Sequence, residues 1–179
     1  RGNKGGPAKN ILLYDENGSH GALATADWLA GNGAALELVT PDRQPGRDIG
    51  VQNLPIYLRN LYRAEARLTP NHRLLSVRRD GNQLLATLWN DYARVRLERR
   101  TDQVIVDRGT LPADAPYQAL KDGARNLGEI DIEALTVLTP QPEDANPTGA
   151  YALYRLGDAM AARDIHAAIL DANRLCRVL

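Results

Sequence analysis

Cysteine is nearly absent from this sequence, since Cys176 is the only one among 179 residues. A single thiol excludes a disulfide within the chain and any iron-sulfur or zinc site built on several of its cysteines. It also suits a reducing cytoplasm, which we expect as the location. Net charge is absent as well, because 22 basic residues balance 22 acidic ones. No overall field attracts nucleic acid, so small molecules or proteins are the expected partners.

Long hydrophobic runs are also missing. No apolar stretch approaches the roughly 20 residues that span a bilayer, and no charged and then apolar leader opens the chain. We therefore expect a soluble protein with no membrane partner. Residues 1–8 are rich in glycine and begin with Arg1, which predicts a linker exposed by truncation or proteolysis.

The chain then shows a strand, a helix and a second strand. Residues 10–14 form a short apolar run that stops at a cluster of turn residues, as a buried strand does. Small apolar residues recur at helical spacing over 21–30, and residues 35–40 predict the next strand. Such a βαβ unit places its two strands parallel.

The next segment has a specific order of elements. We predict a helix at 51–66, antiparallel strands at 74–78, 83–89 and 93–98, a buried strand at 103–107 and a helix at 116–126. This order is typical of the pyridine-nucleotide-binding fold inside two-dinucleotide flavoproteins. We therefore predict an α/β fold, namely a Rossmann-like three-layer domain with a β-meander.

From residue 127 the pattern changes. Three prolines at 140, 142 and 147 indicate a loop or crossover. Residues 153–158 predict a short strand, and 163–178 predict a helix with one apolar face. No partner elements for this strand and helix are recognisable, so we predict an incomplete second domain of FAD type.

Two stretches carry a resemblance to a known family. The first is Lys-Asn-Ile-Leu-Leu-Tyr-Asp-Glu-Asn-Gly-Ser-His-Gly-Ala-Leu-Ala-Thr-Ala at 9–26, and the second is Gly157-Asp158 followed by Ala-Arg-Asp-Ile-His-Ala-Ala-Ile at 162–169. They resemble the C-terminal part of the trimethylamine dehydrogenase and 2,4-dienoyl-CoA reductase family, which includes NADH:flavin oxidoreductases that demethylate N-methyl amines. The similarity runs from about residue 9 to 179.

The resemblance implies a domain map. Residues 9–126 match a small NAD(P)H-binding-like domain, and 127–179 match the C-terminal half of an FAD- or ADP-binding-like medium domain. The family's N-terminal barrel, which carries FMN and a 4Fe-4S cluster and performs the chemistry, is not in this chain. The barrel domain and an electron-transfer protein are the implied partners.

The function implied is that of a fragment of a multidomain FMN-dependent oxidoreductase. The parent would be an amine dehydrogenase or demethylase, or an enoate reductase, and the fragment would serve electron transfer between NAD(P)H and flavin. The alternative is a nucleotide-free scaffold that docks partners and has lost cofactor binding. In both versions the fragment alone is inactive, and no catalytic residue is expected within it.

The turn after the first strand is the main candidate site. Gly18, Ser19, His20 and Gly21 stand where a dinucleotide fold cradles the pyrophosphate at a helix N-terminus. The GxGxxG pattern is not present, and Asp15 and Glu16 would repel a diphosphate. The turn is therefore either a degenerate nucleotide site or only a connection between strand and helix.

Two further pairs are candidates. Thr40 and Arg43 follow the second strand, where a ribose hydroxyl or a 2′-phosphate would be recognised, although a solvated loop explains them equally well. Gly157 and Asp158 resemble the motif that brings a carboxylate to the ribityl chain of FAD, and the alternative is an Asp that complements a helix dipole. The three histidines have no metal-like spacing, so no metal site is expected.

Overall fold

The computed structural model describes residues 8–179, so all but the last residue of the linker expected at 1–8 lies outside the described part. The contacts divide the chain into two units, with the boundary after Gly109. The helix expected at 116–126 therefore falls in the second unit. Each unit is described by itself.

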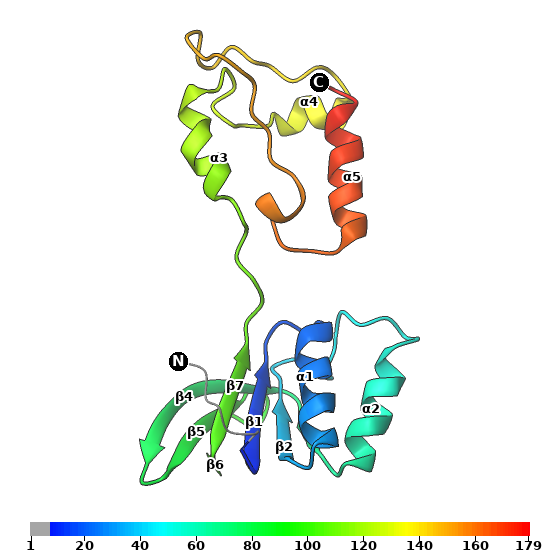
Figure 1. Ribbon diagram of the computed structural model, residues 1–179, viewed down its shortest axis with the longest axis vertical. Helices are drawn as coiled ribbons and strands as arrows, with labels where there is room; N and C mark the ends of the chain where they lie inside the picture. The colour runs from blue at the N-terminus through cyan, green and yellow to red at the C-terminus, as the bar shows by residue number, and fades with distance from the viewer. Residues whose placement is uncertain (1–7) are drawn as a thin grey trace. The chain divides into compact units, whose positions relative to one another are not determined.

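The first unit is built on a four-stranded parallel sheet (Figure 1). Its strands lie in the order β3-β2-β1-β7. β1 pairs on one side with β2 and on the other with β7, and β3 pairs with the far side of β2. The bounds are β1 Asn10–Asp15, β2 Ala35–Val39, β3 Arg67–Thr69 and β7 Gln103–Asp107. The predicted parallel βαβ unit is confirmed, whereas the short β3 was not predicted.

Two helices, α1 (His20–Gly31) and α2 (Leu54–Arg63), cover one face of this sheet. The small residues of α1 let its axis approach the strands closely, and Leu23 and Ala26 are fully buried. They pack against side chains that point to this face from the two central strands, namely Ile11, Leu13, Leu36 and Leu38. This is the larger of the two cores in the first unit.

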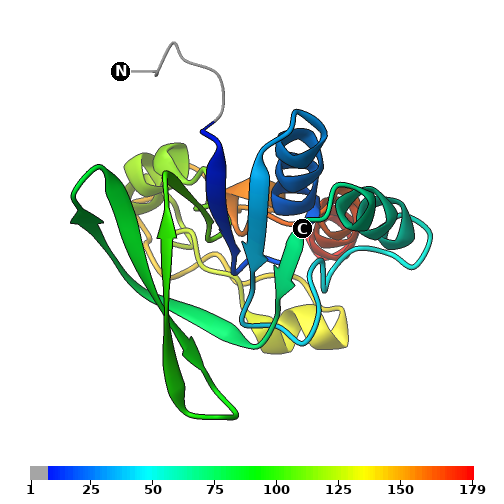
Figure 2. The same ribbon diagram turned by 90° about the horizontal axis from the view of Figure 1, so that it is seen from below.

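A three-stranded antiparallel sheet covers the opposite face (Figure 2). It consists of β4 (His72–Asp80), β5 (Gln83–Asn90) and β6 (Val95–Thr101). Ala86 and Leu88 of β5 pack against Leu12, Tyr14 and Val39 of the parallel sheet. Helices, parallel sheet and meander thus form the three layers predicted from the sequence, and the α/β fold class is confirmed.

The second unit contains the helices α3 (Ala115–Leu120), α4 (Ile132–Val137) and α5 (Ile165–Cys176). The strand predicted at 153–158 is wrong. Leu153 pairs with the Asn126 side chain, which accepts from its amide at 2.9 Å and donates to its carbonyl at 2.8 Å. Because a side-chain amide supplies these bonds, no strand ladder forms here, and Gly157–Ala159 turns into a 3-10 helix. Among residues 8–179, no helix is both long and apolar enough to cross a membrane.

Candidate functional site

The turn between β1 and α1 lies where the strand order changes direction. β2 and β3 extend the sheet on one side of β1, and β7 lies on the other side. In open parallel sheets, ligands bind outside the carboxyl ends of the strands at such a switch point. The turn residues predicted from the sequence therefore occupy the position of a nucleotide site.

Hydrogen bonds to Asp15 shape this turn. Its Oδ1 accepts from the amide of Gly18 at 2.8 Å and from that of Asn17 at 3.1 Å. Gly18 has a φ of +72°, a left-handed conformation that favours glycine. Ser19 caps α1, since its Oγ accepts from the amide of Gly21 at 3.4 Å. The carboxylate thus takes backbone amides that a phosphate would otherwise find at this position.

The crevice between β1 and β7 is narrowed at its carboxyl end. Asp15 and Asp107 are direct partners in the two strands, and the Glu16 amide donates to the Asp107 carbonyl at 2.9 Å beyond the end of β1. Gly109 lies so close to Asn17 that a Cβ on the glycine would stand 3.1 Å from the amide oxygen. Paired backbone and an asparagine therefore occupy part of the space between the strand ends.

The loop after β2 closes the turn from the other side. A Cβ on Gly18 would stand 3.3 Å from Arg47 Cβ and 3.4 Å from Asp42 Oδ2. The Asp48 amide donates to the Gly18 carbonyl at 3.0 Å, and Arg47 pairs with Asp42 at 2.8 Å. Asp42 stands where an NAD site places its ribose-binding carboxylate, but Arg47 already engages it.

Negative charge gathers around the start of α1. Asp15 is fully buried, and its Oδ2 has no hydrogen-bond partner among the described residues; Asp42 Oδ2 is likewise buried and unpaired. Burial raises the pKa of the Asp15 carboxyl, and the charges of Asp107 and Asp42 raise this pKa further, against the amides of Gly18 and Asn17. A diphosphate placed here would face three carboxyl groups and a fourth on Glu16, which pairs with Arg108 at 3.0 Å.

A pocket of about 300 Å³ does open beside the first turns of α1. Its walls include Gly21 and Thr25 of α1 and Asp107 and Arg108 at the end of β7. A Cβ on Gly21 would stand 3.3 Å from Asp107 Oδ2. The surface that faces this helix N-terminus is therefore itself a carboxylate, with Arg108 as the neighbouring cation.

The other predicted residues of the first unit are placed as follows. His20 is exposed at the start of α1, and its Nδ1 lies 3.3 Å from the Tyr57 hydroxyl. Thr40 is fully buried, and its Oγ1 accepts from the Asp42 amide at 3.2 Å. Arg43 is exposed. The structure gathers Gly18 to Gly21 at the turn, but Thr40 cannot reach a ribose because it holds its own loop.

In the second unit, Gly157 and Asp158 lie in a 3-10 turn before α5. Gly157 is buried with a φ of +57°, and a Cβ on it would stand 3.3 Å from Ala168 Cβ in α5. Asp158 is exposed, and its carbonyl accepts from the Ala113 amide at 2.9 Å. Its carboxylate accepts no hydrogen bond from residues 8–179, so it is available to accept hydrogen bonds from the hydroxyl groups of a ligand. The dipole role considered for Asp158 falls to Asp164, which caps α5.

No cluster within residues 8–179 has three or more side chains that could hold a metal ion. Sequence reasoning singled out Asp15 but missed Arg47, Asp107 and Asn17 as parts of this site. Asp107 could have been identified from the sequence, because it is the acidic residue at the end of the buried strand predicted at 103–107.

Comparison with known proteins shows that the chain is similar to part of two longer proteins. It is 43% identical over 175 residues to an N,N-dimethylglycine/sarcosine dehydrogenase from Chromohalobacter salexigens. It is 41% identical over 171 residues to a probable N-methylproline demethylase from Rhizobium meliloti. Each match covers 96% of this chain and 25% of the relative, so the chain spans about a quarter of their length.

A solved structure shows the same fold. Histamine dehydrogenase from Rhizobium sp. 4-9 matches over 96% of this chain and 23% of its own chain, with a TM-score of 0.66 and 18% identity. No known family profile matches the sequence.

Proposed function

We propose that this chain is the nucleotide-domain-like region of a flavin-dependent amine dehydrogenase or demethylase of the trimethylamine dehydrogenase and 2,4-dienoyl-CoA reductase family, because it matches one quarter of two relatives that are named for N-methyl amine substrates. Within it, the first unit is a scaffold that does not bind NAD(P)H. FMN and the 4Fe-4S cluster would lie in the barrel, and that barrel and an electron-transfer protein would be its partners in a reducing cytoplasm.

The closed switch point carries the scaffold proposal. A pyrophosphate needs an open crevice, free amides and net positive potential at the helix N-terminus. Here Asn17 narrows the crevice at Gly109, Asp15 holds the Gly18 amide, and Asp107 faces Gly21. Two like charges about 6 Å apart repel by about 3 kcal/mol at an effective dielectric of 20. One such pair, with the Asp107 carboxylate, which has no salt bridge within residues 8–179, already outweighs the roughly 1 kcal/mol that a helix dipole offers an anion.

The alternative is electron transfer between NAD(P)H and flavin through this unit. Two observations favour it, namely the pocket of about 300 Å³ beside α1 and the exposed Arg43 after β2. A nucleotide would need Asp107 and the loop that carries Arg47 to move away. The residues of the turn before α1 do not fit a dinucleotide in their present positions, so they would not support hydride transfer from NAD(P)H.

The second unit suits a different role. Its exposed Asp158 carboxylate has the position after Gly157 that the resemblance assigns to a contact with the FAD ribityl chain. A bound flavin would supply the electron-carrying ring, and the Asp158 carboxylate would accept hydrogen bonds from the hydroxyl groups of the ribityl chain. The domain map matches residues 127–179 to only the C-terminal half of the FAD-type domain. We therefore propose that Asp158 contributes one contact to the flavin site.

Calorimetric titration of the protein with NADH, NADPH, ADP and FAD tests the proposal. The scaffold reading predicts no heat of binding for NADH or NADPH at millimolar concentration. A micromolar dissociation constant that Gly21→Val abolishes would support electron transfer instead. Gly50→Val is the matched control, because a Cβ on Gly50 meets no atom within 4 Å.

A further inference from the structure

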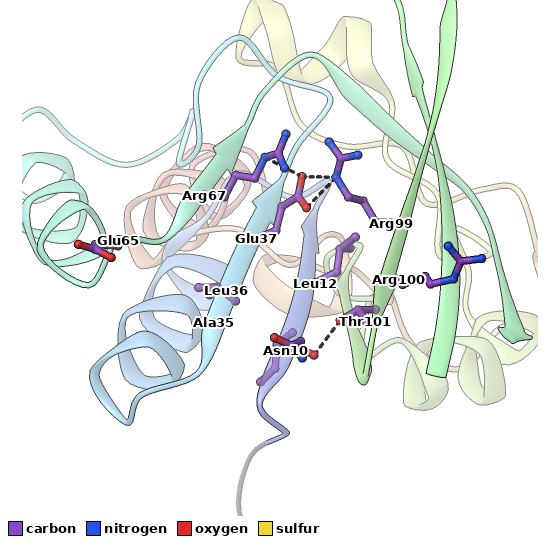
Figure 3. Close-up of a pocket in the computed structure, with 11 residues that line it drawn as sticks. Asn10, Leu12, Ala35, Leu36, Glu37, Glu65, Arg67, Arg99, Arg100 and Thr101 are labelled. Atoms are coloured by element: carbon purple, nitrogen blue, oxygen red, sulfur yellow. Dashed lines mark hydrogen bonds and ion pairs between the residues drawn. The ribbon is translucent and has the colours of Figure 1, made fainter. Parts of the chain in front are cut away.

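A second pocket of the first unit lies at the opposite edge of the parallel sheet (Figure 3). It has a volume of about 290 Å³ and opens between the amino ends of β1 and β2 and the last residues of β6. Leu12, from the core between the two sheets, lies at its base, while Arg67 and Arg99 supply charge. This pocket is separate from the turn between β1 and α1.

One carboxylate, that of Glu37, organises the charges in this pocket. Its side chain is 14% exposed. Arg99 Nε donates to both oxygens at 2.9 and 3.1 Å, and the Thr69 hydroxyl donates to Oε1 at 2.7 Å. Arg67 Nε lies 3.5 Å from the same oxygen. Glu37 is therefore fully engaged and fixes the guanidinium of Arg99.

The two arginines retain donors that Glu37 does not use. Arg99 is 21% exposed, and its Nη1 donates to the Glu98 carbonyl at 3.1 Å. Its Nη2 and both Nη atoms of Arg67 donate to no group within residues 8–179. Figure 3 shows the two guanidinium groups on either side of Glu37. Two cations and one carboxylate leave one positive charge. The Arg67 side chain is 63% exposed, so solvent reaches its donors, whereas the unused donors of Arg99 are partly buried and therefore costly to leave without a partner.

The remaining charged residues of the pocket do not cancel this excess. Arg100 is turned away and pairs with Asp80 at 3.0 Å. Glu65 is exposed, and in Figure 3 its carboxylate points away from Arg67 and Arg99. The local charge next to the free donors is therefore that of a single guanidinium.

We propose that this pocket binds a small carboxylate anion, held between Arg67 and Arg99 with Glu37 as the group that positions them. A guanidinium fork matches a planar carboxylate with two parallel hydrogen bonds. A single excess charge suits a monoanion better than a phosphate dianion. The volume lies at the low end for ligand pockets, so the anion would carry only a few carbon atoms.

Nuclear magnetic resonance tests the site directly. The Arg99 Nε–Hε signal and the Leu12 amide are followed while sodium acetate, then sodium lactate, is added to the protein, with sodium chloride at equal ionic strength as the control. We expect saturable shifts with the carboxylates and only small, linear shifts with chloride. Arg67→Gln should weaken acetate binding about tenfold, the loss of one charge-assisted contact. Arg67→Lys should restore part of it.

Arg63→Gln is the matched control, because Arg63 is an exposed arginine at the end of α2 and does not line the pocket. It should leave acetate binding unchanged. Equal shifts with chloride and acetate, tighter binding of inorganic phosphate than of acetate, or unchanged binding by Arg67→Gln would each overturn the proposal. None of these outcomes depends on whether the turn before α1 binds NAD(P)H.

Discussion

Asp15→Asn tests the account of the closed turn. Asparagine keeps the Oδ1 acceptor for the amides of Gly18 and Asn17. It replaces the buried, unpaired Oδ2 by an NH₂ donor at a turn where Asp42 Oδ2 is also buried without a partner. We expect the variant to be about 1 kcal/mol more stable than the parent at pH 8, the net worth of one hydrogen bond. Asp15→Leu removes the acceptor and should cost about 1–3 kcal/mol.

The pH dependence has a definite sign. Burial raises the folded-state pKa of Asp15 above its usual 3.8. The stability contributed by this protonated carboxyl is complete below the unfolded pKa and is lost as pH rises through the folded pKa. The parent should therefore weaken relative to Asp15→Asn between pH 4 and 8, by about 1.4 kcal/mol for each unit by which the pKa is raised.

Urea unfolding followed by tryptophan fluorescence measures this, because Trp28 and Trp89 both lie in the first unit. Subtracting the Asp15→Asn curve from the parent curve isolates Asp15 from the other titrating groups. A difference that does not change with pH, or an Asp15→Asn protein less stable than the parent at pH 8, would contradict a raised pKa of Asp15.

Three further predictions follow from single contacts. Gly18→Ala should lose about 1–2 kcal/mol in the same urea assay, since its φ of +72° penalises a Cβ, whereas a loss below 0.5 kcal/mol would contradict the turn geometry. Glu37→Ala should lose about 2–4 kcal/mol, because it strands the half-buried Arg99, while Glu98→Ala, which removes an exposed carboxylate, should change stability little. Hydrogen bonds from Gln83 and Asn10 lower the pKa of Asp102. The carbon-13 signal of its carboxyl should therefore titrate below the usual range, and its stabilising effect should be lost only as pH falls through that lowered pKa. A titration in the usual range would contradict these bonds.

Much of the fold of the first unit could be predicted from the sequence. The apolar run of β1 and the small-residue face of α1 are local patterns with clear periodicity, and the turn residues at 15–19 separate them. β3 was missed because its three residues are too few to show a period. The strand expected at 153–158 does not form. The backbone of Leu153 instead pairs with the side chain of Asn126, 27 residues away in the chain, which a local pattern cannot show.

The position of the candidate site could be predicted from the sequence, but the contacts that narrow it could not. The missing glycines and the two acidic residues predicted a poor phosphate turn. That Arg47 and Asp42 pack on Gly18, and that Asp107 faces Gly21, are contacts between segments far apart in the chain. Such contacts leave no period in a single sequence, so the narrowing of the crevice could be seen only in the fold.

If the switch point of the first unit does not admit dinucleotides, NADH should leave the turn before α1 unperturbed. The most direct measurement follows the amide signals of Gly18 and Gly21 while NADH is added to the protein up to millimolar concentration. We expect that neither signal moves beyond what an equal concentration of sodium chloride causes. A saturable shift of both amides with a micromolar dissociation constant would contradict it.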